Sequence, residues 1–315
     1  MIEIIDFECL KKKYAEVVKR YKYYYPIKVN DNPDIINTLH NLGSGFLVAN
    51  YDKALSLMDD YGVPAKNILY IASFTNDEDI TDLLDKGIKF FIVDSYNKID
   101  AISKKTKEVD VLLRVSVPLQ ELDRFGVDVE KTDEYITAIK KAGLNFCGLH
   151  FHIPSQRNSL DIDKLMIKKI VEKYPDLQCL DIGGGCSVEN SKELYDYIMS
   201  ISNIKTVICE IGYGFVNDAI NTETKVIEVK NINGINIASI DIGIYSGLMD
   251  LFLTNRTFSI VSPNNDGEKV LYRVYGPSFD CRDYVGEYLL PTLHVGDKLI
   301  IKNTGAYVRT LLTTF

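Results

Sequence analysis

Eight short apolar runs, each separated from the next by a stretch with helical periodicity, occupy the first two thirds of this 315-residue chain. The runs are continuously apolar rather than alternating, which is typical of parallel strands covered on both faces. Several of the helical stretches begin with cap-like residues, such as Asn32-Pro33 and Asn76-Asp77. The runs lie at residues 23–28, 46–49, 68–72, 89–94, 111–117, 146–152, 178–182 and 206–210. Eight such units predict a (β/α)8 barrel over residues 1–215, with its functional site at the carboxyl ends of the strands.

The pattern changes after about residue 215, where helical periodicity becomes rare and strand-like runs follow one another. Asn233-Gly234 between two of these runs is a typical two-residue hairpin turn. The predicted strands are residues 224–229, 235–240, 257–261, 269–275, 298–302 and 307–313. We therefore expect a second, all-β domain over residues 216–315.

The charge balance of the chain restricts its partners. It has 36 basic and 44 acidic residues, a formal net charge of −8, and a hydrophobic fraction of 46%, which is ordinary for a globular protein. An acidic chain matches nucleic acid or an anionic membrane poorly and small cationic molecules better. We expect no membrane span and no signal peptide, because no apolar run is long enough and the first residues carry no basic segment.

Six cysteines are scattered along the sequence without a Cys-x-x-Cys pair. Such spacing predicts reduced thiols in a cytoplasmic protein, and it argues against a disulfide framework or a zinc site.

A single lysine, Lys28, ends the first apolar run. A lysine at such a position must be paired, reach water, or become reactive through a lowered pKa. The ordinary alternative is a surface lysine at a strand end, and the residue alone does not decide between them.

Two other strand ends carry groups that suit a ligand. Gly183, Gly184 and Gly185 follow the seventh run, where exposed backbone N–H groups in a tight turn suit a phosphate. A flexible turn is the alternative. Glu210 ends the eighth run, and a buried carboxylate there needs a partner, either a pyridinium N–H or a nearby basic side chain.

The sixth and fifth runs end in basic side chains. His150 and His152 would point to the same side of a strand, so a metal site has to be considered. We expect no metal, because no acidic or cysteine ligand stands beside them in the sequence. A ring stacked on a cofactor or a hydrogen-bonded core histidine is the expected role. Arg114 could face an anion or support Glu210.

One small molecule would use all of these groups, namely pyridoxal phosphate (PLP). Its aldehyde would react with Lys28 as a Schiff base, and its phosphate would bind the glycine turn. Its ring nitrogen would need an acidic partner such as Glu210 to stay protonated.

In order along the chain, these segments resemble those of the fold-type III, or alanine-racemase-like, PLP-dependent decarboxylases. This group includes the ornithine, lysine, arginine and diaminopimelate enzymes, and the resemblance covers nearly the whole chain. The segments that carry it are Pro26-Ile27-Lys28-Val29-Asn30, residues 149–155, residues 180–185, Glu210-Ile211-Gly212, Gly276-Pro277-Ser278-Phe279-Asp280, Leu293-His294-Val295-Gly296-Asp297 and Gly305-Ala306-Tyr307.

The resemblance implies a role for each segment. Lys28 would hold the cofactor, His152 would stack on its ring as a second catalytic residue, and Glu210 would bind its ring nitrogen. The other predicted cofactor contacts are Arg114, Ser155, Gly183, Gly184, Gly185, Gly212 and Tyr307. Phe279 and Asp280 would bind substrate from a loop that the partner subunit supplies, so we expect a homodimer with two shared active sites.

The chain departs from the family pattern at several of these positions. Phe279 stands where the family usually has a cysteine that protonates the product carbon. Cys281 could replace that catalytic group, although an extended loop would place it over ~6 Å further along the backbone. Asp280 is retained and would receive a distal amine. The other departures are Ile242 near the family's Asp-Gly motif, Tyr213 in place of a phosphate-binding arginine, and Leu47 in place of a polar residue.

We therefore expect a decarboxylase of an amino acid with a distal amine, as in ornithine, lysine, arginine or diaminopimelate. One alternative is a catalytically silent homologue that holds PLP or binds a partner protein, which the departures motivate. Another is an amino-acid racemase on the same fold. It would need a second base opposite Lys28, for which Tyr307 or Tyr275 could be proposed, but the substrate-loop motif favours decarboxylation.

Overall fold

The computed structural model describes residues 2–117, 124–153, 159–254, 256–264 and 267–313. It divides into two compact units. The barrel unit comprises Lys11–Ile27 and Pro33–Gly214, and the sheet unit comprises Met1–Leu10, Lys28–Asn32 and Phe215–Phe315. The sequence pattern predicted a boundary between residues 215 and 216. It did not anticipate that two N-terminal segments belong with the C-terminal unit.

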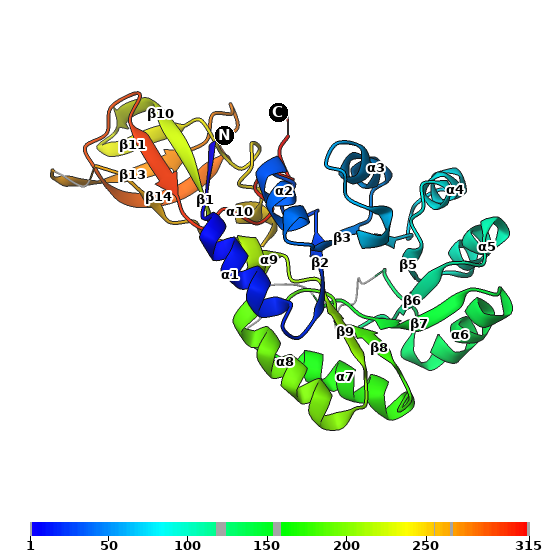
Figure 1. Cartoon of the computed structure of the whole chain (residues 1–315). Coiled ribbons are helices and arrows are strands. Elements are labelled where there is room, and N and C mark those ends of the chain that lie inside the picture. The colour runs from blue at the N-terminus through cyan, green and yellow to red at the C-terminus, as the bar shows by residue number, and fades with distance from the viewer. Residues whose placement is uncertain (1, 118–123, 154–158, 255, 265–266, 314–315) are drawn as a thin grey trace. The chain divides into compact units, whose positions relative to one another are not determined.

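The barrel unit contains a closed ring of eight parallel strands, β2 to β9 in chain order (Figure 1). Each of the eight apolar runs forms one of these strands, so the predicted barrel is confirmed. The strands are β2 (Lys22–Pro26), β3 (Gly45–Val48), β4 (Ile68–Ile71), β5 (Phe90–Val93), β6 (Asp110–Arg114), β7 (Asn145–His150), β8 (Cys179–Asp181) and β9 (Thr206–Cys209).

Helices follow the strands on the outside of the ring (Figure 1). The expected side-chain cap at Asn76 is present at the start of α4, where Asn76 accepts from the Asp79 N–H. Asn50 caps α3 in the same way by accepting from the Lys53 N–H. The helices are α2 (Pro33–Asn41), α3 (Tyr51–Asp59), α4 (Asp77–Asp85), α5 (Tyr96–Lys105), α6 (Thr132–Lys141), α7 (Asp161–Lys173), α8 (Val188–Ile201) and the short α9 (Tyr213–Val216), with 3-10 turns η1 (Ala65–Asn67) and η2 (Val129–Lys131). Among the described residues, no helix combines the length and apolar character needed to cross a bilayer.

Helix α1 (Phe7–Val17) was not predicted from the sequence. Its buried positions are Leu10, Lys13 and Val17, so a lysine lies in the middle of its inward face and breaks the apolar period. The Lys13 ammonium donates to the carbonyl oxygen of Gly214 at 3.1 Å, which satisfies the buried charge in part.

The sheet unit is a seven-stranded sheet in the order β12-β15-β10-β11-β13-β14, with β1 also pairing with β10. Its strands are β1 (Ile2–Ile5), β10 (Ile220–Ile232), β11 (Ile235–Ile240), β12 (Ile260–Val261), β13 (Lys269–Tyr275), β14 (Tyr284–Pro291) and β15 (Lys298–Ile301), and it also carries the one-turn helix α10 (Asp250–Leu253). The predicted all-β architecture is confirmed.

Two details of this unit differ from the sequence prediction. β14 was missed because its buried and exposed residues alternate and Gly286 and Glu287 interrupt the apolar signal. The predicted strand at 307–313 is wrong: Tyr307 has a left-handed φ of 62°, and the segment forms turns. The Tyr307 N–H donates to the carbonyl oxygen of Val29 at 2.8 Å instead of joining a ladder.

Candidate active site

A buried polar layer closes the carboxyl end of the barrel strands. Arg114 on β6 lies directly opposite His150 on β7, and His150 lies opposite Asp181 on β8. All three residues are buried, with relative exposures of 8%, 0% and 0%. Leu112 and Cys179 of the apolar barrel core stand two residues before Arg114 and Asp181. Because side chains on a strand repeat with a period of two, the polar groups point into the same interior.

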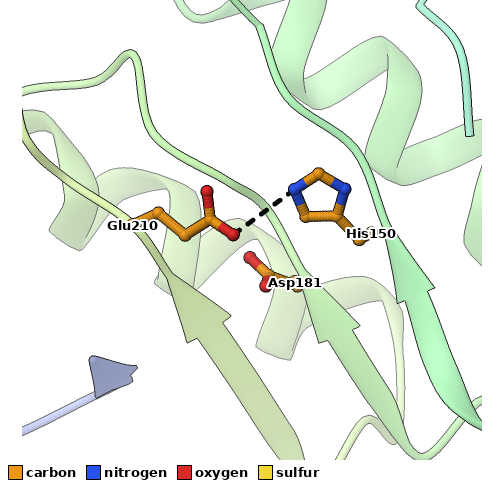
Figure 2. Close-up of side chains that lie close together, drawn as sticks. All are labelled: His150, Asp181 and Glu210. Atoms are coloured by element: carbon orange, nitrogen blue, oxygen red, sulfur yellow. Dashed lines mark ion pairs between the residues drawn. The ribbon is translucent and has the colours of Figure 1, made fainter. Parts of the chain in front are cut away.

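Glu210, one residue after β9, completes this layer (Figure 2). His150 Nε2 lies 3.4 Å from Glu210 Oε1, and Glu210 is 3% exposed. One ligating atom from each of His150, Asp181 and Glu210 falls within 4.8 Å of the others. The expectation that His150 has no acidic neighbour is wrong, because strands about 30 residues apart along the chain bring two carboxylates beside it. His152 is not part of this trio.

The surroundings of Asp181 raise its pKa. Burial is the largest cause that raises the pKa of Asp181 well above its ordinary value of 3.8, and the neighbouring charge of Glu210 is the next. The Gly183 N–H, which donates to Asp181 Oδ1 at 2.8 Å, and the charge of Arg114 oppose this rise only in part. Burial and the neighbouring carboxylate of Glu210 therefore favour the protonated form of Asp181.

The glycine turn after β8 packs closely against Glu210 and His152. A Cβ on Gly184 would come within 2.6 Å of the Glu210 carbonyl oxygen, and one on Gly183, whose φ is +63°, within 2.5 Å of the Phe151 carbonyl oxygen. The Gly184 N–H donates to His152 Nδ1 at 3.2 Å. That bond leaves the ring proton of a neutral His152 on Nε2 and fixes the orientation of the ring.

A pocket of about 210 Å³ opens beside this turn, between the loops that follow β8 and β9. Ser187 caps helix α8 by accepting from the Asn190 N–H, and it pairs with Gly214 across the two loops. The lining residues are Ser159, Leu160, Gly185, Cys186, Ser187, Asn190, Tyr213 and Gly214. The lining is neutral, with small residues and hydroxyl and amide groups, and it stands at the positive end of a 14-residue helix.

Lys28 belongs to the sheet unit, where it follows the last residue of β2 by two positions. Its carbonyl oxygen accepts from Thr310 Oγ1 at 2.8 Å, beside the bond between Tyr307 and Val29. Burial is the largest cause that raises the pKa of Tyr307. The structure therefore brings the backbones of two predicted site residues, Lys28 and Tyr307, into one cluster.

The predicted substrate loop follows β13. Phe279 is fully exposed, at 111% of its reference area, and Cys281 is also exposed. The Asp280 carboxylate accepts from Tyr245 and Arg282 within the same unit. Phe279, Asp280 and Cys281 line a pocket of about 530 Å³ together with parts of β10 and β11.

The buried carboxylate of Asp283 holds this loop in shape through backbone hydrogen bonds. It is 1% exposed and accepts from the backbone N–H groups of Ile244 at 2.6 Å and Ser278 at 3.1 Å. Ile242, the residue nearest to the family's Asp-Gly acid in sequence, is 3% exposed and packs in the apolar core of the sheet unit. It is therefore a core residue rather than a substrate contact.

Comparison with known families identifies the family of the chain that carries this site. Residues 6–224 match the family described as "Pyridoxal-dependent decarboxylase, pyridoxal binding domain". The chain belongs to the pyridoxal-dependent decarboxylases. Its cofactor is accordingly PLP, and its reaction class is amino-acid decarboxylation.

Individual relatives of this decarboxylase agree with the family match. A lysine/ornithine decarboxylase of Selenomonas ruminantium is 27% identical over 316 residues, covering 93% of this chain and 80% of the relative. A diaminopimelate decarboxylase of Helicobacter pylori strain J99 is 26% identical, covering 96% and 84%. The solved structure of SrLDC in complex with PLP and cadaverine superposes with a TM-score of 0.90 at 24% identity, covering 99% of this chain and 86% of that one.

The barrel residues of this decarboxylase fit PLP. The buried Glu210 offers a carboxylate acceptor for a ring N–H. The glycine turn leaves no room for side chains on Gly183 and Gly184, and the neutral pocket offers hydrogen-bond donors to a phosphate. Gly212 is buried after β9, and Ser155 lies outside the described residues.

Sequence reasoning missed several residues that lie in or beside the candidate site. Asp181 is a lone charge inside an apolar strand, and that signal could have found it. His150 was considered only as a metal ligand or core residue, because its partners lie 31 and 60 positions away. Tyr245, Arg282 and Asp283 had no local signal, since their roles come from contacts within the folded loop.

Proposed function

We propose that this decarboxylase acts on an amino acid with a distal amine and that Lys28 holds PLP covalently. The observation that carries the proposal is the buried trio of His150, Asp181 and Glu210 at the strand ends, an acid site matched to a protonated ring nitrogen. β2 pairs directly with β9, and Lys28 and Glu210 follow these two neighbouring strands. Bound PLP would supply the electron sink for the bond between Cα and the carboxyl group.

The chain's own residues would then divide the remaining work. Glu210 keeps a proton on the ring nitrogen, and His150 and Asp181 hold Glu210 in place. His152, oriented by the Gly184 N–H, covers one face of the ring and excludes water from it. Gly183, Gly184, Gly185, Gly212, Tyr307 and the neutral pocket bind the phosphate, while Arg114 balances charge next to Asp181.

The reaction also needs a proton donor to Cα of the product. We propose Lys28 or Cys281 for this role, since Phe279 cannot donate a proton. Cys281 is exposed in the substrate loop, where a thiol could reach a neighbouring site. Asp280 is the proposed acceptor for the distal amine.

Replacing Lys28 tests the proposal most directly. Lys28→Ala should abolish the absorbance band of the lysine-bound cofactor, and borohydride reduction of the wild type should leave a cofactor adduct on residue 28, located by mass spectrometry. Lys66→Ala, a change of an exposed lysine, is the matched control. An adduct on a different lysine would remove Lys28 from this role.

We further propose a two-fold homodimer in which the loop with Phe279 completes the neighbour's site. Its support is the exposed Phe279 ring beside a large pocket, together with exposed apolar residues that face each other across strands of the same sheet. These pairs are Ile232 with Ile235 and Leu271 with Leu289. The six free cysteines agree with a reducing, cytoplasmic location, which we also propose.

Mixing two inactive variants tests the shared site. Lys28→Ala and Asp280→Ala affect opposite sides of it, so random exchange of subunits should restore about one quarter of the native sites. Activity that stays at the level of the separate variants, or an active monomer in sedimentation experiments, would contradict the dimer. Carbon dioxide release from ornithine, lysine, arginine and diaminopimelate would identify the substrate.

A further inference from the structure

The Asp280 carboxylate has no acceptor position left for another donor. Its Oδ1 accepts from the backbone N–H of Arg282 at 2.9 Å and from the Arg282 Nε at 3.0 Å. Its Oδ2 accepts from Arg282 Nη2 at 2.5 Å and from the Tyr245 hydroxyl at 2.8 Å. A carboxylate offers about four such positions, so an incoming ammonium group must displace one of these donors.

The Arg282 side chain is the donor that can leave. It is 77% exposed, whereas the Asp280 side chain is 16% exposed. The Arg282 backbone N–H is fixed, because Asp283 N–H donates to the Asp280 carbonyl oxygen and the buried Asp283 carboxylate anchors the loop. A solvated guanidinium loses little when an exposed ion pair opens, since water replaces the carboxylate.

We propose that Arg282 is a tethered competitor for the distal amine of the substrate. Its guanidinium occupies the carboxylate that the amine would use, so Arg282 sets the affinity of the site for substrates with a distal amine. This inference rests on the proposed role of Asp280 in the decarboxylase. It adds Arg282 to that site as a residue that determines specificity. Arg282 acts because the distal ammonium of the substrate must replace its guanidinium on Asp280.

The size of the effect follows from the fraction of molecules in which the Arg282 guanidinium is not bound to the Asp280 carboxylate. A site that is competent for only a fraction of the time binds its ligand more weakly by that fraction. Exposed ion pairs are modest, even with two parallel hydrogen bonds, so removing Arg282 should improve the affinity for a distal amine about two- to five-fold. The affinity for an amino acid without that amine should not change.

The test compares Arg282→Gln with the wild type in the PLP-loaded enzyme. We expect the KM for L-lysine or L-ornithine to fall about two- to five-fold. Binding of L-norleucine, which has the chain of lysine without its amine, is followed by the visible absorbance and should be unchanged. Arg273→Gln is the matched control, because Arg273 is an exposed arginine paired with Glu287 at 2.9 Å on the same sheet. Adding Asp280→Asn to Arg282→Gln should abolish the gain.

An unchanged or higher KM for lysine and ornithine in Arg282→Gln would overturn the inference, and a higher one would mean that Arg282 itself contacts the substrate. Calorimetric titration with 1,5-diaminopentane gives the same comparison without turnover. Wild-type enzyme that decarboxylates only amino acids without a distal amine would overturn the proposed substrate instead. The diamine titration would then still decide whether Arg282 competes for Asp280.

Discussion

Replacing Asp283 by alanine should destabilise the sheet unit strongly, although Asp283 is expected to touch neither substrate nor cofactor. Its carboxylate is 1% exposed and accepts from the N–H groups of Ile244 and Ser278. Removing it leaves the buried Ile244 N–H and the partly buried Ser278 N–H without this acceptor, each at a cost of about 1–3 kcal/mol. The free energy of unfolding should therefore fall by about 2–6 kcal/mol.

Packing adds to this loss. The Asp283 carboxylate lies where side chains on Gly243 and Gly276 would otherwise stand, so it fills the space between these two glycines. Alanine leaves a cavity there, which adds a further cost that grows with its volume. Asp283→Asn keeps the volume but turns one acceptor into an amide donor that faces a backbone N–H. We expect its destabilisation to be about half that of alanine.

Urea unfolding of the cofactor-free protein, followed by circular dichroism, measures both variants at a fixed protein concentration. Glu268→Ala, a change of an exposed acidic residue in the same unit, is the control and should change the free energy of unfolding little. If Asp283→Ala were no more destabilising than this control, the carboxylate would not be what holds the substrate loop, and the reasoning would fail.

Two further predictions concern the barrel. Asp181→Asn should flatten the pH dependence of stability: the raised pKa of Asp181 makes the folded state bind more protons above about pH 4, so wild-type stability falls as the pH rises toward that pKa. Urea unfolding between pH 4 and 8 measures this, and equal slopes for both proteins would refute it. Gly184→Ala should weaken PLP binding at least about ten-fold, because its Cβ would come within 2.6 Å of the Glu210 carbonyl oxygen and displace the turn or the acid. Spectroscopic titration with PLP provides the measurement, and unchanged affinity would show that the turn has room to spare.

Much of the barrel could be predicted because its signals are local. Each strand is a short apolar run, and helices α3, α4 and α8 begin at a side-chain cap, so local signals gave the order of the elements. Helix α1 was missed because Lys13 lies on its buried face. β14 was missed because its inward and outward residues alternate around Gly286. In both cases tertiary contacts decide the structure, and the local pattern does not record them.

Only part of the candidate site could likewise be predicted from local sequence signals. The glycine turn and Glu210 were found because they end apolar runs, where a small or charged residue is conspicuous. The partnership of Glu210 with His150 and Asp181 depends on the register of three strands, which no single segment contains. The hydrogen bonds from Arg282 to the Asp280 carboxylate form within a turn, because the two residues are only two positions apart. The sequence does not reveal the geometry of that turn.

The attachment of residues 28–32 has a consequence for the order of events during synthesis. Lys28 and Val29 gain their backbone partners from Thr310 and Tyr307, and the first of these bonds spans 282 positions. A ribosome must therefore finish almost the entire polypeptide before the segment around Lys28 can settle. The segment around Lys28 thus reaches its final structure late in synthesis. A prematurely terminated chain could complete every strand of the barrel and still lack the folded segment around Lys28.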